Sequence, residues 1–165
     1  MPATYEPIAT VTLGSTSSPI TFSSIGATYT DLRLVLVGTN NSAGQYVFMR
    51  LNSDSGTNYS QTGIFANGTS TSAYTSPGSS LMGIVDNPLS TTIPNMQTFD
   101  IFSYAGSLFK TILMIGSTDK NGSGSSEIAV GLWRNTVAIT SVTLFPGSGT
   151  FNVGTSATLY GIKAA

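Results

Sequence analysis

The sequence contains no cysteine and no histidine among its 165 residues, and these absences exclude several kinds of site. Without cysteine there are no disulfides and no thiolate metal sites, so stability must come from burial and from pairing with other chains. Without histidine, the Ser-His-Asp and Cys-His catalytic arrangements and the usual zinc sites cannot be assembled. We therefore expect a protein that is not an enzyme, with no catalytic residue and no cofactor.

Charge is also scarce. Charged residues make up 8% of the chain, and six Lys and Arg against seven Asp and Glu leave a net charge of −1. The scattered cations form no basic stripe, so we expect no binding to nucleic acid. The carboxylates fall at expected strand ends and turns, where acids commonly form local turns or face water. A carboxylate pair that cleaves glycans is therefore only a third alternative for function.

Long apolar runs are missing as well. A helix that spans a bilayer needs roughly 18 or more apolar residues in a row, and no stretch of this chain approaches that length. The first residues, "MPATYEPIATVTLG", lack the basic start and apolar run of a secretion signal. We therefore expect no membrane partner, and synthesis in the cytoplasm without a signal peptide.

The chain does contain short apolar runs that recur between clusters of Gly, Asn, Ser and Pro. This spacing is typical of an all-β sandwich or barrel, and no segment with helical periodicity competes with it. We predict one domain, residues 1–165, folded as a jelly-roll-like antiparallel β-sandwich of about 8–11 strands. The expected strands lie near residues 6–13, 19–24, 30–38, 45–52, 59–65, 80–86, 96–104, 108–117, 126–134, 139–145 and 156–163.

The longest segment without a strand pattern is "ANGTSTSAYTSPGSS", residues 66–80. Its Ser, Thr and Gly residues leave little to bury, which predicts an exposed loop. Tyr74 is the one aromatic residue in it and has no packing partner nearby in the sequence. Tyr74 is therefore the best candidate for contact with an external ligand.

The segment "LFKTILMIG", residues 108–116, is apolar on both faces of the expected strand. A two-layer sandwich covers only one face of a strand, so the other must lie under a loop or against another subunit. This predicts a homo-oligomer, which we take to be a trimer. The residues that we expect at its interface are Leu108, Ile112, Met114 and Trp133.

Trp133 and Arg134 are adjacent in "VGLWRNTVAITSVTLF", but alternation directs them to opposite faces of a strand. Trp133 shares its face with two small residues, Ala129 and Gly131, and therefore has room to lie flat across the strand. This arrangement favours packing or a subunit contact over stacking on a ligand. Arg134 is expected to reach a carboxylate or a carbonyl at the rim of the sandwich.

The segment "DKNGSGSSE", residues 119–127, partly matches a calcium-binding loop. The calcium candidates are Asp119, Asn121, Ser123 and Glu127. Position twelve of the pattern, however, is Val130 instead of a bidentate Glu, and the flanking segments are strand-like. The other interpretation is a hairpin turn, because Asn-Gly between two apolar strands is the strongest short signal for one.

Three segments carry a resemblance to a known family: "ATVTLGSTSSPITFSSIGATYTDLRLVLVGT", "MRLNSDSGTNYS" and "VGLWRNTVAITSVTLFPGSGTFNVGTSATLYGIKAA". Together they are similar to a family of small β-proteins encoded by tailed bacteriophages, especially environmental and cyanobacterial phages. The resemblance implies a structural protein of the virion with a jelly-roll-like sandwich. It transfers no catalytic residue. Residues 64–95 depart most from the family pattern, and a receptor-contact loop is expected there.

From the resemblance and the surface chemistry we expect a capsid decoration or cement protein, located in the virion and made in the host cytoplasm. It would stabilise the head by contacts with the major capsid protein. The alternative is a receptor- or carbohydrate-binding module of a tail fibre, with a host-surface glycan as its partner. Copy number and position in the virion distinguish the two.

Overall fold

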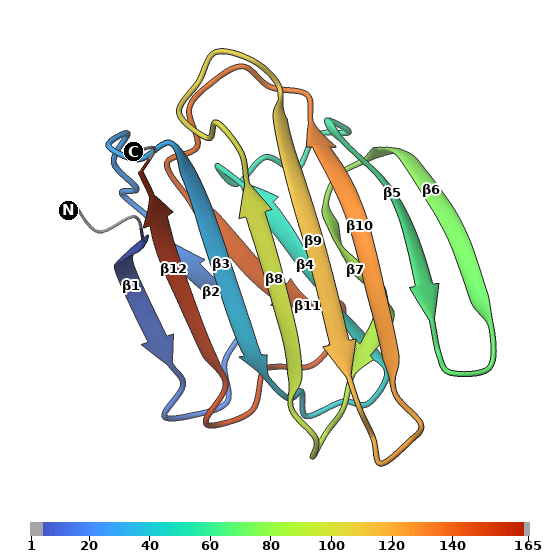
Figure 1. Ribbon diagram of the computed structural model, residues 1–165. Coiled ribbons are helices and arrows are strands. Elements are labelled where there is room, and N and C mark those ends of the chain that lie inside the picture. The colour runs from blue at the N-terminus through green and yellow to red at the C-terminus, as the bar shows by residue number, and fades with distance from the viewer. Residues whose placement is uncertain (1–4, 164–165) are drawn as a thin grey trace.

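The computed structural model describes residues 5–163, which fold into two β-sheets packed face to face (Figure 1). The strands are β1 (Tyr5–Thr12), β2 (Ile20–Phe22), β3 (Asp31–Gly38), β4 (Gln45–Leu51), β5 (Tyr59–Ala66), β6 (Thr71–Ser79), β7 (Met82–Leu89), β8 (Asn95–Ile101), β9 (Lys110–Thr118), β10 (Ser125–Trp133), β11 (Val142–Pro146) and β12 (Ser156–Ile162). The described part of the chain contains no helix of the length and apolar character needed to cross a membrane.

The larger sheet has eight strands in the order β1-β12-β3-β8-β9-β10-β5-β6, and the smaller has four in the order β2-β11-β4-β7. Every strand pair in the described residues is antiparallel. The expected all-β antiparallel sandwich is therefore confirmed, with twelve strands in place of the 8–11 predicted.

The chain crosses between the sheets along most of its length. The first four strands alternate between the larger and the smaller sheet, and β7, β8, β11 and β12 alternate in the same way. Two hairpins, β5–β6 and β9–β10, do not alternate, because both of their strands stay in the larger sheet. They extend that sheet at one end, where β5 and β6 form its outermost part (Figure 1).

The core lies between the two sheets and follows from alternation along the strands. Successive side chains of a strand point to opposite faces, so every second residue faces the core. Two strands show the pattern most plainly: the core-facing, fully buried residues of β3 and β4 are Leu32, Leu34, Leu36, Val47, Met49 and Leu51. One cluster of buried residues contains side chains from both sheets.

The prediction of an exposed loop over residues 66–80 is wrong for most of that segment. Residues 71–79 form β6, which pairs with β5 through the register Ile64↔Ala73 and Phe65↔Ser72. A strand rich in Ser, Thr and Gly has little apolar pattern, so composition alone did not reveal it. Its regularity comes from backbone pairing with β5, which composition does not encode.

The four edge strands, β1 and β6 of the larger sheet and β2 and β7 of the smaller, are each either short or irregular. Pro7 lies in β1, Pro77 in β6 and Pro88 in β7, while β2 has only three residues. The pairings of β1, β6 and β7 also contain a register shift. Proline removes an N–H donor, and a bulge interrupts the ladder, so both features suit an edge rather than a central strand.

Candidate functional site

The outer face of the larger sheet is the most distinctive surface of the molecule. On β9 the core-facing residues Ile112 and Met114 are fully buried, while Leu113 and Ile115, which alternate with them, point outward. The pairing of β9 with β10 and of β10 with β5 brings further outward apolar residues alongside. We call this group the apolar patch; its members are Ile64, Leu113, Ile115, Ile128, Val130 and Leu132.

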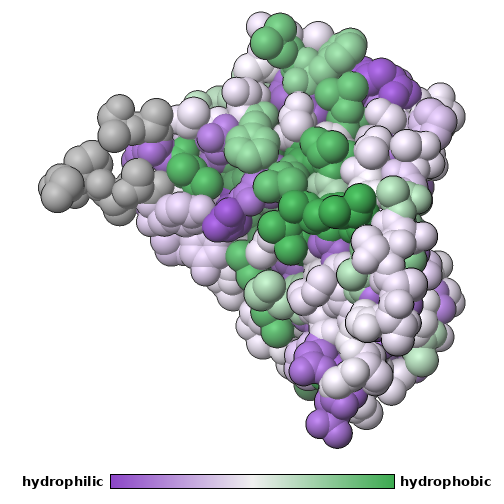
Figure 2. Space-filling model, turned by 45° about the vertical axis from the view of Figure 1, so that its right-hand side comes forward, coloured by the Kyte–Doolittle hydropathy of each residue, from purple (hydrophilic) through white to green (hydrophobic). Residues whose placement is uncertain are grey.

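The apolar patch is open to solvent in the single chain. Ile64 is 52% exposed, Ile128 43% and Val130 46%. Figure 2 shows hydrophobic side chains gathered in the middle of the face that comes forward in that view. Soluble monomers rarely expose contiguous apolar patches of more than a few hundred Å², so these residues are the candidate contact surface of the molecule.

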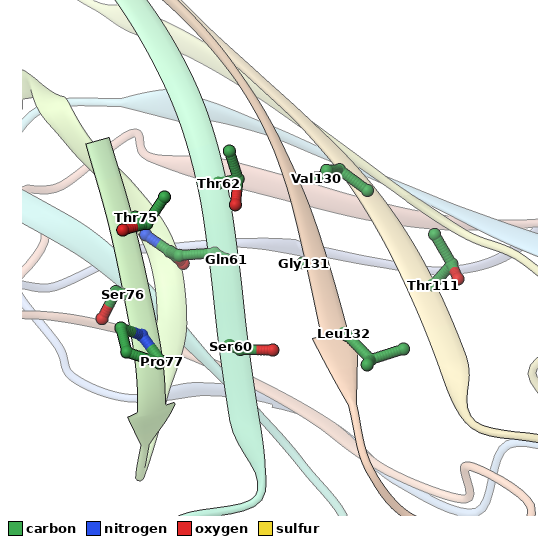
Figure 3. A pocket seen from close by; sticks show the side chains of 10 residues that line it. All are labelled: Ser60, Gln61, Thr62, Thr75, Ser76, Pro77, Thr111, Val130, Gly131 and Leu132. Atoms are coloured by element: carbon green, nitrogen blue, oxygen red, sulfur yellow. The ribbon is translucent and has the colours of Figure 1, made fainter. Parts of the chain in front are cut away.

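Two hollows lie along the seam between β5 and β10. The first measures about 350 Å³ and has a hydroxyl-rich rim formed by Ser60, Thr62, Thr75, Ser76 and Thr111, around Val130 and Leu132 (Figure 3). The second, of about 270 Å³, is largely apolar and includes Ile64, Ile115 and Ile128. A face with hollows of this size can receive side chains of a partner as well as lie flat against it.

At one end of the same face, the loop between β8 and β9 adds three more exposed apolar residues, Phe102, Leu108 and Phe109. The first residue of β9, Lys110, holds this loop in place. Its side chain is fully buried and donates hydrogen bonds to the carbonyls of Gly106, Leu108 and Thr136. Burial lowers the pKa of Lys110. The ammonium group therefore fixes the loop that presents Leu108.

Three of the four predicted interface residues are in fact core residues. Ile112, Met114 and Trp133 have no exposed surface, because β9 and β10 turn them toward the smaller sheet. They cannot contact a second subunit, and the prediction is wrong for them. Leu108 is 77% exposed and remains available. The two-sided apolar pattern of β9 was identified correctly, but the free face is the one with Leu113 and Ile115.

Trp133 is part of a buried hydrogen-bonded group at one end of the core. Its ring stacks on Tyr59 with centroids 6.4 Å apart, and its Nε1 donates to Oδ2 of Asp54 at 2.7 Å. Asp54 also accepts from the Asn58 amide and from the backbone N–H of Gly56. Burial acts to raise the pKa of Asp54, but these hydrogen bonds, led by that of Trp133, outweigh it and lower the pKa.

Arg134 follows Trp133 and points away from the core. Its Nη2 donates to the carbonyl of Thr57 at 2.5 Å, so the carbonyl contact expected at the rim is present. The two adjacent residues therefore do not form one binding site. Trp133 packs, as its small neighbours on the strand indicated.

Tyr74 is not an exposed ligand contact. On β6 it stands opposite Gly63 of β5, and its ring fills the space that a side chain at Gly63 would need. The ring packs against the core, and its hydroxyl donates to Oε1 of Glu127 at 2.5 Å. Burial, and then the bond to Glu127, raise the pKa of Tyr74. The prediction for Tyr74 is therefore wrong.

Glu127 secures the hairpins β5–β6 and β9–β10, which we call the inserted hairpins, to the smaller sheet. It is buried, and besides Tyr74 its carboxylate accepts from the backbone N–H groups of Val85 and Asp86 in β7, at 3.1 and 2.6 Å. The carboxylate thus joins strands β6, β7 and β10. Sequence analysis missed this role, because nothing local in the sequence shows that β7 crosses over residue 127.

The calcium hypothesis requires the side chains of Asp119, Asn121, Ser123 and Glu127 to converge on one ion, but in the structure the Asp119 and Glu127 carboxylates have separate partners. Glu127 faces inward as described, whereas Asp119 accepts the backbone N–H of Gly122 within the turn. Asn121 and Gly122 have φ values of 59° and 88°, the left-handed conformation that an Asn-Gly hairpin turn favours. β9 and β10 pair on either side of it, so the hairpin interpretation is confirmed and the calcium interpretation is corrected.

At the β1–β12 edge of the larger sheet, away from the apolar patch, the outer face carries polar side chains. Thr10 of β1 is hydrogen-bonded to Thr158 of β12 at 3.0 Å, and Thr12 to Ser156 at 3.3 Å. We call these four residues the hydroxyl patch. Next to it, Arg33 of β3 makes a two-pronged salt bridge to Asp100 of β8. The polar groups of this end are thus paired with one another.

Residues 5–163 contain no cluster of three or more acidic residues placed to hold a metal ion. The chain matches no protein-family model, no curated protein and no solved structure. Fold and surface chemistry are therefore the basis for a functional proposal.

Proposed function

We propose that this chain is a structural protein of a bacteriophage virion. In this proposal it is a capsid decoration protein that assembles as a homotrimer and stabilises the head by binding the major capsid protein. The observation that carries the proposal is the apolar patch, with its two hollows, on the outer face of β9, β10 and β5.

The strand path supports a protein of this class. When the β5–β6 and β9–β10 hairpins are set aside, the remaining strands form two four-stranded sheets, β1-β12-β3-β8 and β2-β11-β4-β7. In a jelly roll, two four-stranded sheets are joined by a chain that passes repeatedly from one sheet to the other, and such folds are common in viral capsid domains, so this strand order supports the proposal. The resemblance of the sequence to phage β-proteins points in the same direction.

The arrangement of the exposed apolar residues favours a ring over a two-fold dimer. Half of the exposed large apolar side chains among the described residues lie on two surfaces, the apolar patch and the tip of the loop with Phe102, Leu108 and Phe109. Contact between two different surfaces of identical chains is heterologous, and a heterologous contact that closes forms a ring. A trimer is the smallest such ring, and its exposed remainder would be left to bind the shell.

Two measurements test the proposal. Size-exclusion chromatography with light scattering at micromolar concentration is expected to give three times the mass of the chain, and a clean monomer would contradict the oligomer. A reconstruction of the virion that contains this chain is expected to show it in hundreds of copies over the head. Density for it only at the tail tip would overturn the capsid assignment.

The second candidate is the receptor- or carbohydrate-binding module of a tail fibre. One observation favours it: the smaller sheet carries an aromatic-lined pocket with an arginine at its rim. A fibre module would be present in only a few copies per virion, so the same reconstruction distinguishes it from a decoration protein.

A further inference from the structure

The outer face of the smaller sheet holds a pocket on the opposite side of the sandwich from the apolar patch. It measures about 240 Å³ and is lined by Pro19, Arg50, Ser53, Thr143 and Phe145. Pockets that enclose drug-sized ligands measure about 300–1,000 Å³. This pocket therefore suits a single ring or a single acidic group, and it does not suit a long chain.

Paired strands hold the walls of the pocket. Arg50 of β4 stands directly opposite Thr143 of β11, and Phe145 follows two residues further along. Met49 and Leu51 on either side of Arg50, and Leu144 between Thr143 and Phe145, are fully buried, so alternation fixes the pocket side chains on the outer face. A site built on strands keeps its geometry better than one built on loops.

Arg50 differs from the other two arginines, Arg33 and Arg134, because neither of its terminal Nη atoms has a hydrogen-bond partner among residues 5–163. Its Cζ lies 5.0 Å from the centre of the Phe145 ring, and its Nε donates to the carbonyl of Ser80 at 3.3 Å. Within residues 5–163 no carboxylate lies within ion-pair distance of it, and its two Nη atoms have no hydrogen-bond partner. In contrast, the guanidinium of Arg33 is occupied by Asp100.

The rest of the lining is part polar and part apolar. Ser53 is exposed, and Thr143 lies at the pocket wall, where its hydroxyl is hydrogen-bonded to that of Thr21 at 3.2 Å. Pro19 and the ring of Phe145 supply apolar surface, and Phe145 is supported by Phe48 with ring centroids 6.1 Å apart. One cation, two hydroxyls and an apolar wall form a mixed site, whereas phosphate sites typically use several backbone N–H donors or cations.

We infer that this pocket binds one carboxylate-bearing sugar unit of an acidic glycan. The two Nη atoms of Arg50 match the geometry of a carboxylate, which an arginine holds through two parallel hydrogen bonds. The apolar face of the sugar ring packs against Phe145 and Pro19, and its hydroxyls face Ser53 and Thr143. The inference does not depend on the decoration role, which uses the other sheet and different residues, but it deepens the alternative of a carbohydrate-binding fibre module, which rests on this same pocket.

The experiment is a two-dimensional NMR titration of the full chain with glucuronic acid, with glucose as the neutral match and inorganic phosphate as the simple anion. We expect glucuronic acid to shift the signals of Arg50, Ser53, Thr143 and Phe145 with millimolar affinity, and glucose to bind at least about tenfold more weakly. Equal shifts with phosphate would overturn the inference, because they would indicate a general anion site. Absence of shifts up to about 50 mM glucuronic acid would also overturn it.

Variants then assign the effect to the pocket. Arg50→Gln is expected to abolish the glucuronic acid shifts, and Arg50→Lys to weaken binding about tenfold, because lysine cannot hold a carboxylate through two parallel bonds. Arg134→Gln is the matched control and should leave binding unchanged. Ser53→Gly keeps the fold, since Ser53 already has a φ of 57° that glycine adopts freely, and is expected to weaken binding severalfold. Wild-type affinity in both Arg50 variants would overturn the inference.

Discussion

On the outer face of the larger sheet, the hydroxyl patch and the apolar patch differ in whether their side chains have partners within the chain. In the hydroxyl patch, Thr10, Thr12, Ser156 and Thr158 bond to one another across β1 and β12. In the apolar patch, Ile64, Ile128 and Val130 have no covering layer in the single chain. The difference follows the strands on which the patches lie. The hydroxyl patch lies on β1 and β12, which remain when the inserted hairpins are set aside, and the apolar patch lies on β5, β9 and β10, which belong to the inserted hairpins. The inserted hairpins therefore extend the sheet with an exposed apolar surface, which a partner covers in the proposed function.

The largest expected effect separates the two faces of β9. Met114→Ala removes a fully buried side chain and should lower the free energy of unfolding by about 2–5 kcal/mol. Leu113→Ala, one residue away on the outer face, should cost the isolated chain about 1 kcal/mol or less. Urea unfolding followed by Trp133 fluorescence, at a concentration below association, measures both. Similar losses for the two variants would contradict the assignment of faces.

The next effect compares the two patches directly. Val130→Asp places a charge in the apolar patch and should weaken self-association about a hundredfold, or 2.8 kcal/mol, because the carboxylate would be buried without a partner. Thr158→Asp makes the same change in charge within the hydroxyl patch and should leave association unchanged. Sedimentation velocity over a concentration series gives both constants. Association that survives Val130→Asp would remove the apolar patch from the proposed interface.

A smaller effect is expected where the inserted hairpins are tied to β7. Glu127→Gln leaves one amide oxygen to accept and turns an NH₂ group toward backbone donors, which should cost about 1–3 kcal/mol. Faster hydrogen exchange at the amides of Val85 and Asp86 is expected with it. Ser126→Ala, the exposed neighbour, is the control and should change stability by no more than about 0.5 kcal/mol. Unchanged exchange at those two amides would show that Glu127 does not secure β7.

The smallest expected effect is the loss of stability at low pH that comes from Asp54. The pKa of Asp54 is lowered in the folded state, so its ionised form stabilises the fold above the ordinary value of 3.8. That stabilisation is lost as the pH falls through the lowered folded pKa. We expect the melting temperature of the wild type to fall below about pH 4, and Asp54→Asn to show a flatter acid limb together with lower stability at pH 7. Parallel acid limbs in the two proteins would contradict this account.

Much of the fold could be predicted from the sequence, because alternation is a local property. The residues of "DLRLVLVG" and "LFKTILMIG" showed which side chains share a face, and the Asn-Gly pair at 121–122 showed a hairpin turn. β6 was missed because its Ser- and Thr-rich residues carry no apolar period, and backbone pairing with β5 defines it instead.

Only part of the candidate surface could be predicted from the sequence by alternation. The sequence showed that β9 is apolar on both faces, but which face meets the core depends on how the two sheets stack. The apolar patch also needs the register Ile128↔Ile115 and Ile128↔Ile64, which joins residues far apart in the chain. The roles of Glu127 and Arg50 depend on contacts between segments that no local spacing encodes. Alternation along "SSEIAVGLW" puts Ile128 and Val130 on one face of a strand, but it does not show that Ile64 and Ile115 lie beside them.

The edge strands have a consequence for how such molecules behave when they are crowded. Free strand edges are templates on which sheets of neighbouring molecules can add end to end, which leads to fibrous aggregation. Here prolines in β1, β6 and β7, and the shortness of β2, obstruct that growth at every edge. Copies at high local concentration are therefore obstructed from joining edge to edge into continuous sheets.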